Sequence, residues 1–516
     1  MRPTYLGFEV QKRTLQLAQK NIDIVGNNIS NINTPGYTRQ RVDLYSEYVS
    51  VNSSFRWASP NSNLSMQGQG VNAYGVSQIR DIYIDRRYRE NVAVEAESEK
   101  CVGILSDIED VLDNFETDGL QYFTQEFFNS LQDYSMQTPD SSEVATICVN
   151  TAKNLCRLLN DYDKQLREVE SMYVGELKDT VSHINNITDQ VNKLNERIRR
   201  EKIHYNEEYG PNELYDELNM FVDELATYGD VEVSENSDGT FSIKMGGIEL
   251  VNGEKLKTNR ILMKDYDTYQ QAILTYESGE ELNLASGQLK GYYDMINGNG
   301  VYATGHQNGS YGIAYFKSAI DQFARTLAGV FNGANGGDED LSRRMFTSIP
   351  ADTVITAGNI HISDEWLHNP TMIGQVRRLD PVSGQYQYGY DEKRDEVTGE
   401  VNLQNTNVIY LISQLENSNI EFGNSHDFQG GFYEYISFIS NRLGQTIQYE
   451  SSRYDTAEVT VDGLLDARDN VSAPQMDEEG INMMNYQKWY SASSRLVTTL
   501  DELLDKLING TGRVGL

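Results

Sequence analysis

Cysteine is scarce in this chain of 516 residues, which has only Cys101, Cys148 and Cys156. An odd number of cysteines, at spacings that match no zinc-binding pattern, argues against a disulfide framework and against a structural zinc site. Cys148 and Cys156 lie eight residues apart in a predicted helix, which separates their Cα atoms by roughly 12 Å. That distance is too long for a disulfide bond. We therefore expect all three cysteines to be small buried hydrophobic residues.

Long apolar runs are also absent. No stretch approaches the roughly 18 apolar residues of a membrane-spanning helix, so the sequence predicts no insertion into a membrane. The first residues, Met1 to Gly7, contain neither the apolar core nor the small-residue cleavage site of a secretory leader. If the protein leaves the cell, we expect it to do so without a standard signal peptide.

Basic residues are few compared with acidic ones. The chain has 43 Lys and Arg against 77 Asp and Glu, which gives a formal net charge of −34. Binding to a phosphate backbone needs a basic surface, so this balance argues against DNA or RNA as a partner. It argues equally against a polybasic anchor at a lipid surface. We interpret the charge mainly as a solubilising surface.

The common signatures of enzymes are missing as well. None of the six histidines belongs to a His-Glu-x-x-His motif, and neither a Gly-x-Ser-x-Gly elbow nor a phosphate-binding loop occurs. The glycines at 298 and 300 follow a predicted helix, which is the wrong context for a dinucleotide fingerprint. The acidic run at 338–340 lacks the spacing of a calcium-binding loop. We predict that the protein is not an enzyme and has no catalytic residues, cofactor or metal.

What the chain does contain is an amphipathic helical pattern at each end. In both patterns apolar positions alternate at spacings of three and four residues, which is typical of a coiled-coil seam. The first pattern stops at 30–37, where Pro35 and Gly36 suit the middle of a type II turn. Neither helix can bury its apolar face alone, so we expect each to pack against another helix. The seam positions are Leu15, Ala18, Ile22, Val25 and Ile29, and Tyr486, Tyr490, Ser493, Val497, Leu500, Leu504 and Leu507.

Helical and β patterns alternate between the two ends. A proline-free helical pattern from about 140 to 205 would span some 90 Å, which is typical of a rod-like protein. Alternating residues on both sides of Asp238 and Gly239 predict a small β unit with a hairpin turn. We interpret residues 38–80 as irregular and extended, and 404–470 as helical.

Together these patterns predict an elongated α+β multidomain protein. Long α-helical coiled-coil or bundle regions are built from both chain ends, and β-rich domains are inserted in the middle. The predicted domains are a terminal paired-helix domain (1–45 with 475–516), a helical rod domain (46–226 with 286–340 and 401–474), a small β domain (227–285) and a strand- and turn-rich outer segment (341–400).

Two segments resemble the family of flagellar rod, hook and hook-associated axial proteins. In the first segment, 27–40, the run Gly-Tyr-Thr-Arg-Gln is most similar to the hook-associated protein 1, or FlgK, type. The second, 477–509, is similar to the family's C-terminal helix, except that Trp489 stands where the family usually has alanine. The signature residues are Asn27, Asn28, Asn31, Thr34, Pro35, Gly36, Tyr37, Thr38 and Arg39.

The resemblance implies a structural subunit of the bacterial flagellum, in a ring that joins hook to filament. It implies export, largely unfolded, through the flagellar type III apparatus to the extracellular flagellum, and it makes the seam residues subunit-interface positions. The implied partners are other copies of the chain, the hook protein, the second hook-associated junction protein, an export chaperone and the export apparatus. Two alternatives stay open: a flagellar hook subunit, which the long helix after 140 disfavours, and a flagellum-borne adhesin that uses 341–400.

Overall fold

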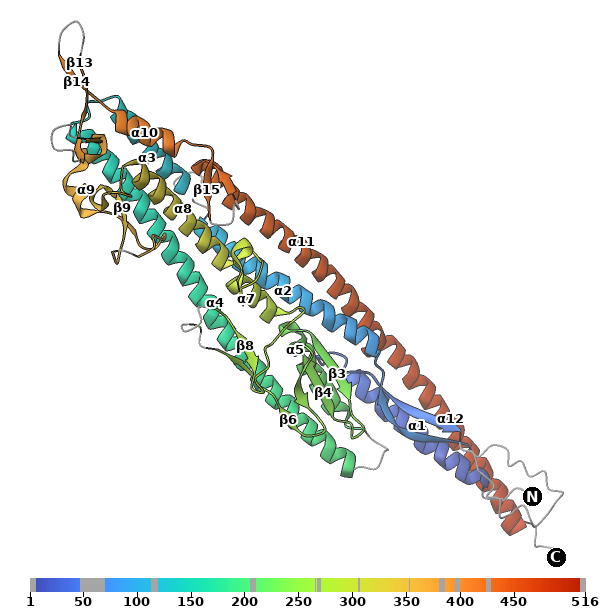
Figure 1. Ribbon diagram of the computed structural model, residues 1–516. Coiled ribbons are helices and arrows are strands. Elements are labelled where there is room, and N and C mark those ends of the chain that lie inside the picture. The colour runs from blue at the N-terminus through green and yellow to red at the C-terminus, as the bar shows by residue number, and fades with distance from the viewer. Residues whose placement is uncertain are drawn as a thin grey trace, which may run out of the picture.

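The molecule is long and narrow, and both chain ends lie at the same end of it (Figure 1). This elongated α+β architecture, with long terminal helices and small sheets between them, confirms the predicted fold class. No helix among the described residues is long and apolar enough to cross a membrane. The computed structural model describes residues 6–46, 70–112, 119–204, 210–264, 266, 271–304, 307–351, 353–379, 386–394, 400–423 and 428–510.

Helices form most of the described structure. The longest, α4, has 63 residues, so it spans about 95 Å and confirms the helix predicted over 140–205. The helices are α1 (Leu6–Ser30), α2 (Ile82–Leu112), α3 (Leu120–Ser135), α4 (Ser142–His204), α5 (Asn212–Tyr228), α7 (Gln288–Asn297), α8 (Ile313–Ala334), α9 (Asp364–His368), α10 (Thr406–Leu415), α11 (Phe432–Ser472) and α12 (Met476–Asp505).

The strands are short and form small antiparallel sheets. One sheet has four strands, in the order β3-β4-β5-β6, and the others are pairs. The strands are β1 (Gln40–Ser46), β2 (Val71–Gln78), β3 (Val231–Glu235), β4 (Phe241–Met245), β5 (Ile248–Asn252), β6 (Lys257–Thr258), β7 (Ile261–Met263), β8 (Leu274–Tyr276), β9 (Phe346–Ser348), β10 (Ile360–Ile362), β11 (Val376–Leu379), β12 (Tyr386–Gly389), β13 (Asp391–Arg394), β14 (Val401–Gln404), β15 (Ile420–Phe422) and β16 (Phe428–Gly430).

One continuous apolar core follows the long axis of the helical body. The helices α2, α3, α4, α8 and α11 line it, and aromatic rings of α3, α8 and α11 meet inside it. Cys101, Cys148 and Cys156 lie in this core as free, buried thiols, as predicted. Burial raises the pKa of the Cys148 thiol to about 11, so this thiol is protonated and unreactive at neutral pH.

The predicted β unit packs against the second half of α4. Strands β3 and β4 pair from Val231↔Met245 to Glu235↔Phe241, and Gly239 has a φ of 78° in the turn between them, as its sequence predicted. Two α4 side chains hold the unit in place. The Asn195 carboxamide accepts from the Phe241 N–H and donates to the Phe241 C=O, both at 2.8 Å, and Asn185 does the same to Ile261.

Two predicted segments differ from the structure. Residues 40–46 and 71–78, which we expected to be irregular, form the antiparallel pair β1–β2; residues 47–69 between them lie outside the described part. The helix expected over 404–470 is interrupted by the β15–β16 pair between α10 and α11. Strands β15 and β16 have three residues each, too few for a clear alternating pattern. Strands β1 and β2 have seven and eight residues, but they lie far apart in the sequence, so local turn chemistry gives no sign that they pair.

Candidate subunit-assembly site

The two terminal helices run side by side in opposite directions and touch near both ends of the pair (Figure 1). Near one end, a Cβ built on Gly7 would lie 3.7 Å from the Leu500 Cδ1 atom. Near the other end, the Asn28 carboxamide donates to Glu479 Oε2 at 3.2 Å. In each helix 21 residues, or three heptads, separate the two contacts. The pair therefore keeps one register along its length.

The predicted seam of α1 lies partly inside this contact. Ala18 and Val25 are 0% and 5% exposed. They lie 11 and 18 residues after Gly7, about three and five whole turns, so they fall on the same face of α1 as Gly7, which meets α12. The flanking positions Leu15, Ile22 and Ile29 are half-buried.

A second buried face of α1 was missed in the sequence. Leu17 and Ile24 pack against Val42 of β1 and Val76 of β2 in a small apolar cluster of their own. The seven-residue spacing of Leu17 and Ile24 was a usable signal. Because we interpreted the following segment as irregular, nothing in the sequence suggested what would cover this face. Helix α1 is thus held between α12 and a β-hairpin.

The predicted seam of α12 is less deeply buried. Ser493 is 3% exposed, and Tyr490 and Leu507 are 39% and 56% exposed, so the structure does not bury these last two in the helix pair. The remaining predicted positions, Tyr486, Val497, Leu500 and Leu504, are half-buried.

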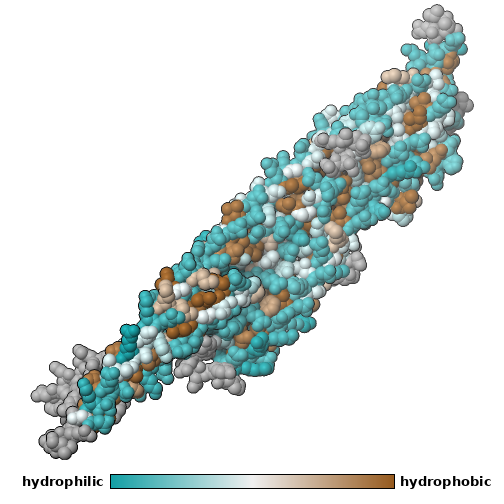
Figure 2. Space-filling view, turned by 180° about the vertical axis from the view of Figure 1, so that it is seen from behind, coloured by the Kyte–Doolittle hydropathy of each residue, from teal (hydrophilic) through white to brown (hydrophobic). Residues whose placement is uncertain are grey.

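A further apolar stripe on α12 is exposed to solvent. Ile481, Met484, Leu496 and Leu503 are 54%, 54%, 50% and 62% exposed. At 100° per residue these four side chains fall on one face of α12, separate from the face that meets α1. Elsewhere too, apolar side chains interrupt the hydrophilic surface along the long axis (Figure 2). A helix with two apolar faces, one of them uncovered, is suited to contact with another protein.

The signature segment forms the base of the terminal pair. Pro35 and Gly36 occupy the middle of a turn in which the Tyr37 N–H donates to the Thr34 C=O at 3.2 Å, and Gly36 has a φ of 76°. This confirms the predicted type II turn. A Cβ on Gly36 would lie 2.5 Å from Met220 Cγ, so α5 also leaves no room for a side chain there.

Asn28 is the centre of the hydrogen-bond network in this segment and is 1% exposed. Its Oδ1 accepts from the Gln40 N–H at 3.0 Å and from the Tyr37 hydroxyl at 2.9 Å. Its Nδ2 donates to the Gln40 C=O at 2.9 Å and to Glu479. Asn28 thereby fastens the end of α1 to the start of β1 and to α12. Asn27, Asn31 and Thr34 continue the network on the exposed side.

Arg39 joins the signature segment to the C-terminal helices. Its Nη1 lies 2.7 Å from Glu478 Oε2, and its Nε lies 2.6 Å from Glu479 Oε1. Its backbone N–H donates to the Ser472 C=O, the last residue of α11, at 2.8 Å. The two glutamates were not predicted as site residues. They lie in the first turn of α12, where the helix dipole favours acidic side chains. That general preference is enough to explain two glutamates at this position, so the sequence offered no reason to expect a specific partner for them.

Thr38 connects the same segment to the helical body. It hydrogen-bonds the carboxylate of Asp216 on α5, which also accepts from Gln78 Nε2 at 2.8 Å. Burial raises the pKa of Asp216 to about 6, against the hydrogen bonds of Thr38 and the charge of Arg80, which lower it. One compact polar site therefore joins α1, β1, α5, α11 and α12.

A second polar network continues from this site into the body. Arg468 of α11 lies 3.1 Å from Asp85 and 2.7 Å from Asp223, and Arg89 lies 2.7 Å from the same Asp223. Three helices, α2, α5 and α11, are linked by these pairs. Because the groups are mostly buried, removal of one partner would leave an uncompensated charge. Among the described residues, no group of three or more His, Cys, Asp or Glu is arranged to hold a metal ion.

Known protein families match both ends of the chain and the helical body between them. The family described as flagellar hook-associated protein FlgK helical domain matches residues 105–345. The flagella basal body rod protein family matches 8–38, and the flagellar basal body rod FlgEFG protein C-terminal family matches 471–510. A protein of Bacillus subtilis named flagellar hook-associated protein 1 is 27% identical, with 99% of each chain covered. Along nearly its whole length, the chain is therefore similar to proteins named flagellar hook-associated protein 1.

Further similar proteins carry the same name or fold. Flagellar hook-associated protein 1 of Salmonella typhimurium is 23% identical over 96% of this chain and 98% of its own. The structure of the flagellar hook junction protein FlgK from Burkholderia pseudomallei has the same fold, with a TM-score of 0.52 and 12% identity. It covers 73% of this chain and 99% of its own. The two family matches at the chain ends coincide with α1 and α12, the helices that carry the site.

Proposed function

We infer that this chain is a structural subunit of the bacterial flagellum that forms the junction between hook and filament. The observation that carries this inference is the similarity to hook-associated protein 1 along nearly the whole chain. The shape supports it, because an elongated body with both termini paired at one end can stand side by side with copies of itself. Since the family is structural, we propose that the chain has no catalytic activity.

The paired terminal helices are the proposed assembly domain, within the predicted 1–45 and 475–516. Their exposed stripe leaves apolar surface in water, which costs about 25 cal/mol per Å² until a neighbour covers it. Copies of the chain, the hook protein and the second hook-associated junction protein are the proposed neighbours. The helical body, the small β domain over 227–285 and the outer segment over 341–400 are proposed as separate units carried by this base.

We further propose that the chain reaches the extracellular flagellum through the flagellar type III apparatus with the help of an export chaperone. The three cysteines are free and buried, so no disulfide among them would hinder passage of an unfolded chain.

Immunogold labelling of intact flagella with antibody to this chain tests the proposed function. Label confined to a band between hook and filament is expected. Label along the whole hook would contradict the junction assignment and favour a hook subunit, against the family match that spans α4. Label scattered over the cell surface would favour an adhesin.

Truncation tests the proposed assembly domain. Removal of 1–30 or of 480–516 should leave the body folded, because its core lies in other helices, and should abolish incorporation into flagella. Circular dichroism of the purified variants and labelling of flagella report the two properties separately. A truncated chain that still reaches the junction would refute the assignment of assembly to the terminal pair.

A further inference from the structure

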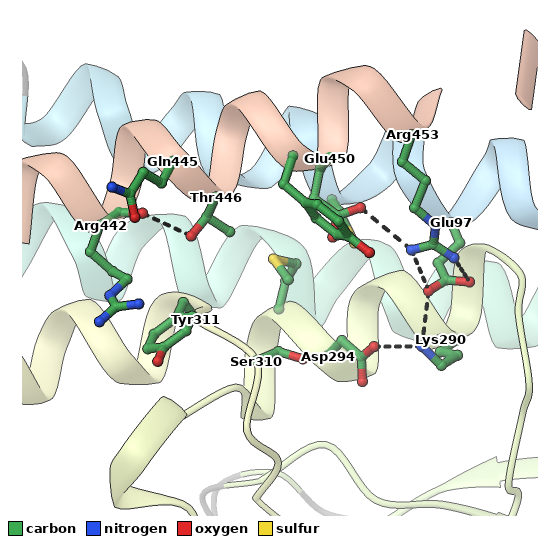
Figure 3. A pocket seen from close by; sticks show the side chains of 13 residues that line it. Glu97, Lys290, Asp294, Ser310, Tyr311, Arg442, Gln445, Thr446, Glu450 and Arg453 are labelled. Atoms are coloured by element: carbon green, nitrogen blue, oxygen red, sulfur yellow. Dashed lines mark hydrogen bonds and ion pairs between the residues drawn. The ribbon is translucent and has the colours of Figure 1, made fainter. Parts of the chain in front are cut away.

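A cleft between α2, α7 and α11 lies in the middle of the body, far from the terminal pair. Its volume is about 350 Å³. Figure 3 shows two groups of side chains in it: Arg442 and Tyr311 at one end, and an ion-pair network at the other. The two groups differ in whether their charges are compensated.

The ion-pair network is complete. Glu97, which is 1% exposed, lies 2.9 Å from Lys290 and 3.0 Å from Arg453. Lys290 also pairs with Asp294 at 2.7 Å, and Arg453 pairs with Glu450 at 3.4 Å. Every charged member of this end has an opposite partner, so it has little attraction for an added ion.

Arg442 is different, because the described residues give it no carboxylate partner. Its guanidinium lies over the rings of Tyr311 and Phe438, at 4.6 Å and 5.3 Å from their centroids. Stacking of this kind holds the guanidinium plane in place and leaves its N–H edge available. Thr446 lies beside Arg442 at this end of the cleft, where its hydroxyl donates to the Arg442 C=O at 2.8 Å (Figure 3). This end is therefore suited to a carboxylate from outside the molecule.

The chain itself presents unpaired carboxylates on another face of the same two helices. We call Glu95 and Glu99 of α2 with Glu458 and Asp462 of α11 the acidic ridge; none of the four has an ion-pair partner among the described residues. They lie close enough that Glu99, Glu458 and Asp462, after burial, raise the pKa of Glu95. At 100° per residue, Glu95 and Glu99 point about 200° around α2 from Glu97, which faces the cleft.

We propose that the Arg442 cleft receives the acidic ridge of a second copy of this chain, so that copies bind side by side. A cleft and a complementary ridge on different faces make a heterologous contact, which is the kind that closes into rings or continues as helices. Charge complementarity selects the occupant, since the ridge presents four carboxylates without an ion-pair partner among the described residues, on a face of the same two helices that points away from the cleft. The inference rests on the proposed function, because only an assembling protein has such neighbours.

The proposal also fixes how neighbouring copies are offset. Glu458 and Asp462 lie 16 and 20 residues beyond Arg442 on the same helix. At a rise of about 1.5 Å per residue, this places them about 24–30 Å along α11. Parallel neighbours joined by this contact must therefore be shifted along the long axis by about that distance.

Charge reversal in cells tests the contact. Arg442→Glu should lower the fraction of flagella with label at the junction by about tenfold or more, because the lost pair becomes a repulsion. Glu458→Arg with Asp462→Arg should do the same. The chain with all three changes should recover part of the lost incorporation, since the reversed cleft then meets the two reversed positions on α11, although Glu95 and Glu99 keep their charge. Arg157→Glu is the matched control, because it makes an equal change of charge at an exposed arginine of α4 that has no ion-pair partner in the described part of the chain; it should behave like wild type.

Three outcomes would overturn the proposal. Normal incorporation of Arg442→Glu would show that the cleft takes no part, and failure of the combined variant to recover would exclude the ridge as its partner. In both cases the labelling of the wild-type chain is a separate test of the proposed function. Label at the junction supports that function whatever the variants do, whereas label elsewhere contradicts it. Equal loss in the Arg157→Glu control would mean that net charge, not this contact, governs incorporation, and would also overturn the proposal.

Cross-linking gives a second, independent measurement. In a chain with Arg442→Cys and Glu458→Cys, mild oxidation of isolated flagella should give covalent oligomers of the subunit. The native cysteines are buried and do not compete. Each single-cysteine variant is the control and should stay monomeric. Absence of oligomers from flagella that contain the double variant would contradict the side-by-side contact.

Discussion

Asn28 offers the sharpest test of the polar base of the terminal pair. Asn28→Ala removes an acceptor for the Gln40 N–H and the Tyr37 hydroxyl, and a donor for the Gln40 C=O and Glu479. Tyr37 keeps a second contact from Asn27, so the main loss is at the Gln40 backbone. A buried polar group without a partner costs about 1–3 kcal/mol. Two such groups predict a local loss of roughly 3–4 kcal/mol.

Hydrogen exchange of the purified chain measures this loss where it occurs. Because about 1.4 kcal/mol corresponds to a factor of ten, the Gln40 amide should exchange about 10²–10³ times faster in Asn28→Ala, provided that it exchanges by local opening. Amides in the middle of α4 should be unchanged. Asn27→Ala is the control, since Asn27 is half-buried and its hydrogen bonds are shared with Asn31; a change of less than about tenfold is expected.

Asn28→Asp separates the two halves of the hydrogen-bonding role. It keeps the acceptors but loses the donors, and it places a second carboxylate beside Glu479, whose Oε2 now lies 3.2 Å from Asn28 Nδ2. At neutral pH this variant should lose at least as much protection as Asn28→Ala. If the Gln40 amide exchanges at the wild-type rate in both variants, the view of Asn28 as the centre of this network is refuted.

Three further predictions concern the same site. Leu500→Asp should separate the helix pair and increase amide exchange in α1, whereas Leu503→Asp, on the exposed stripe, should leave the pair intact and still block incorporation; equal exchange in the two would contradict the assignment of faces. Asp216 has a pKa raised to about 6, so wild type should lose local stability as the pH rises through about 6, by roughly 2–3 kcal/mol. In urea titrations at pH 4 and pH 7, Asp216→Asn should remove that difference, and an unchanged pH dependence would count against it. Gly36→Ala should cost about 1–3 kcal/mol because of its positive φ and the contact with Met220, while Gly26→Ala, which meets nothing within 4 Å, should be neutral or slightly stabilising in the same melting experiment.

The sequence predicted the features that depend on local periodicity. The terminal helices, α4 and the Asp238–Gly239 hairpin follow from apolar spacing and turn chemistry over a few neighbouring residues. The β1–β2 pair and the interruption of the last helical region by β15–β16 were missed, because their partners come from distant parts of the chain or from very short strands. The same reason explains why Glu478 and Glu479 were not predicted beside Arg39.

One recurring contact could not be predicted from the sequence, although the asparagines that make it could be read there. In this contact, an asparagine carboxamide on a helix accepts from the backbone N–H of a residue elsewhere in the chain and donates to the C=O of that same residue. The four pairs are Asn28 with Gln40, Asn185 with Ile261, Asn195 with Phe241 and Asn332 with Phe346. Each asparagine thereby pairs a strand or loop to a helix side as another strand would. Asparagine is common in turns and caps, so only the partner's position distinguishes this role.

The polar base also solves a problem that the heptad seam alone leaves open. A seam of apolar residues repeating every seven can slip by a whole heptad without much loss of contact, and polar residues are a known means of fixing one register. Here Asn28 contacts Glu479 and Gly7 lies against Leu500, which is the same register at both ends. In that register Ala18 and Trp489 stand at the same level of the pair. A slip by seven residues would leave Asn28 and Arg39 without their glutamates, and those buried groups make the slipped pair costly.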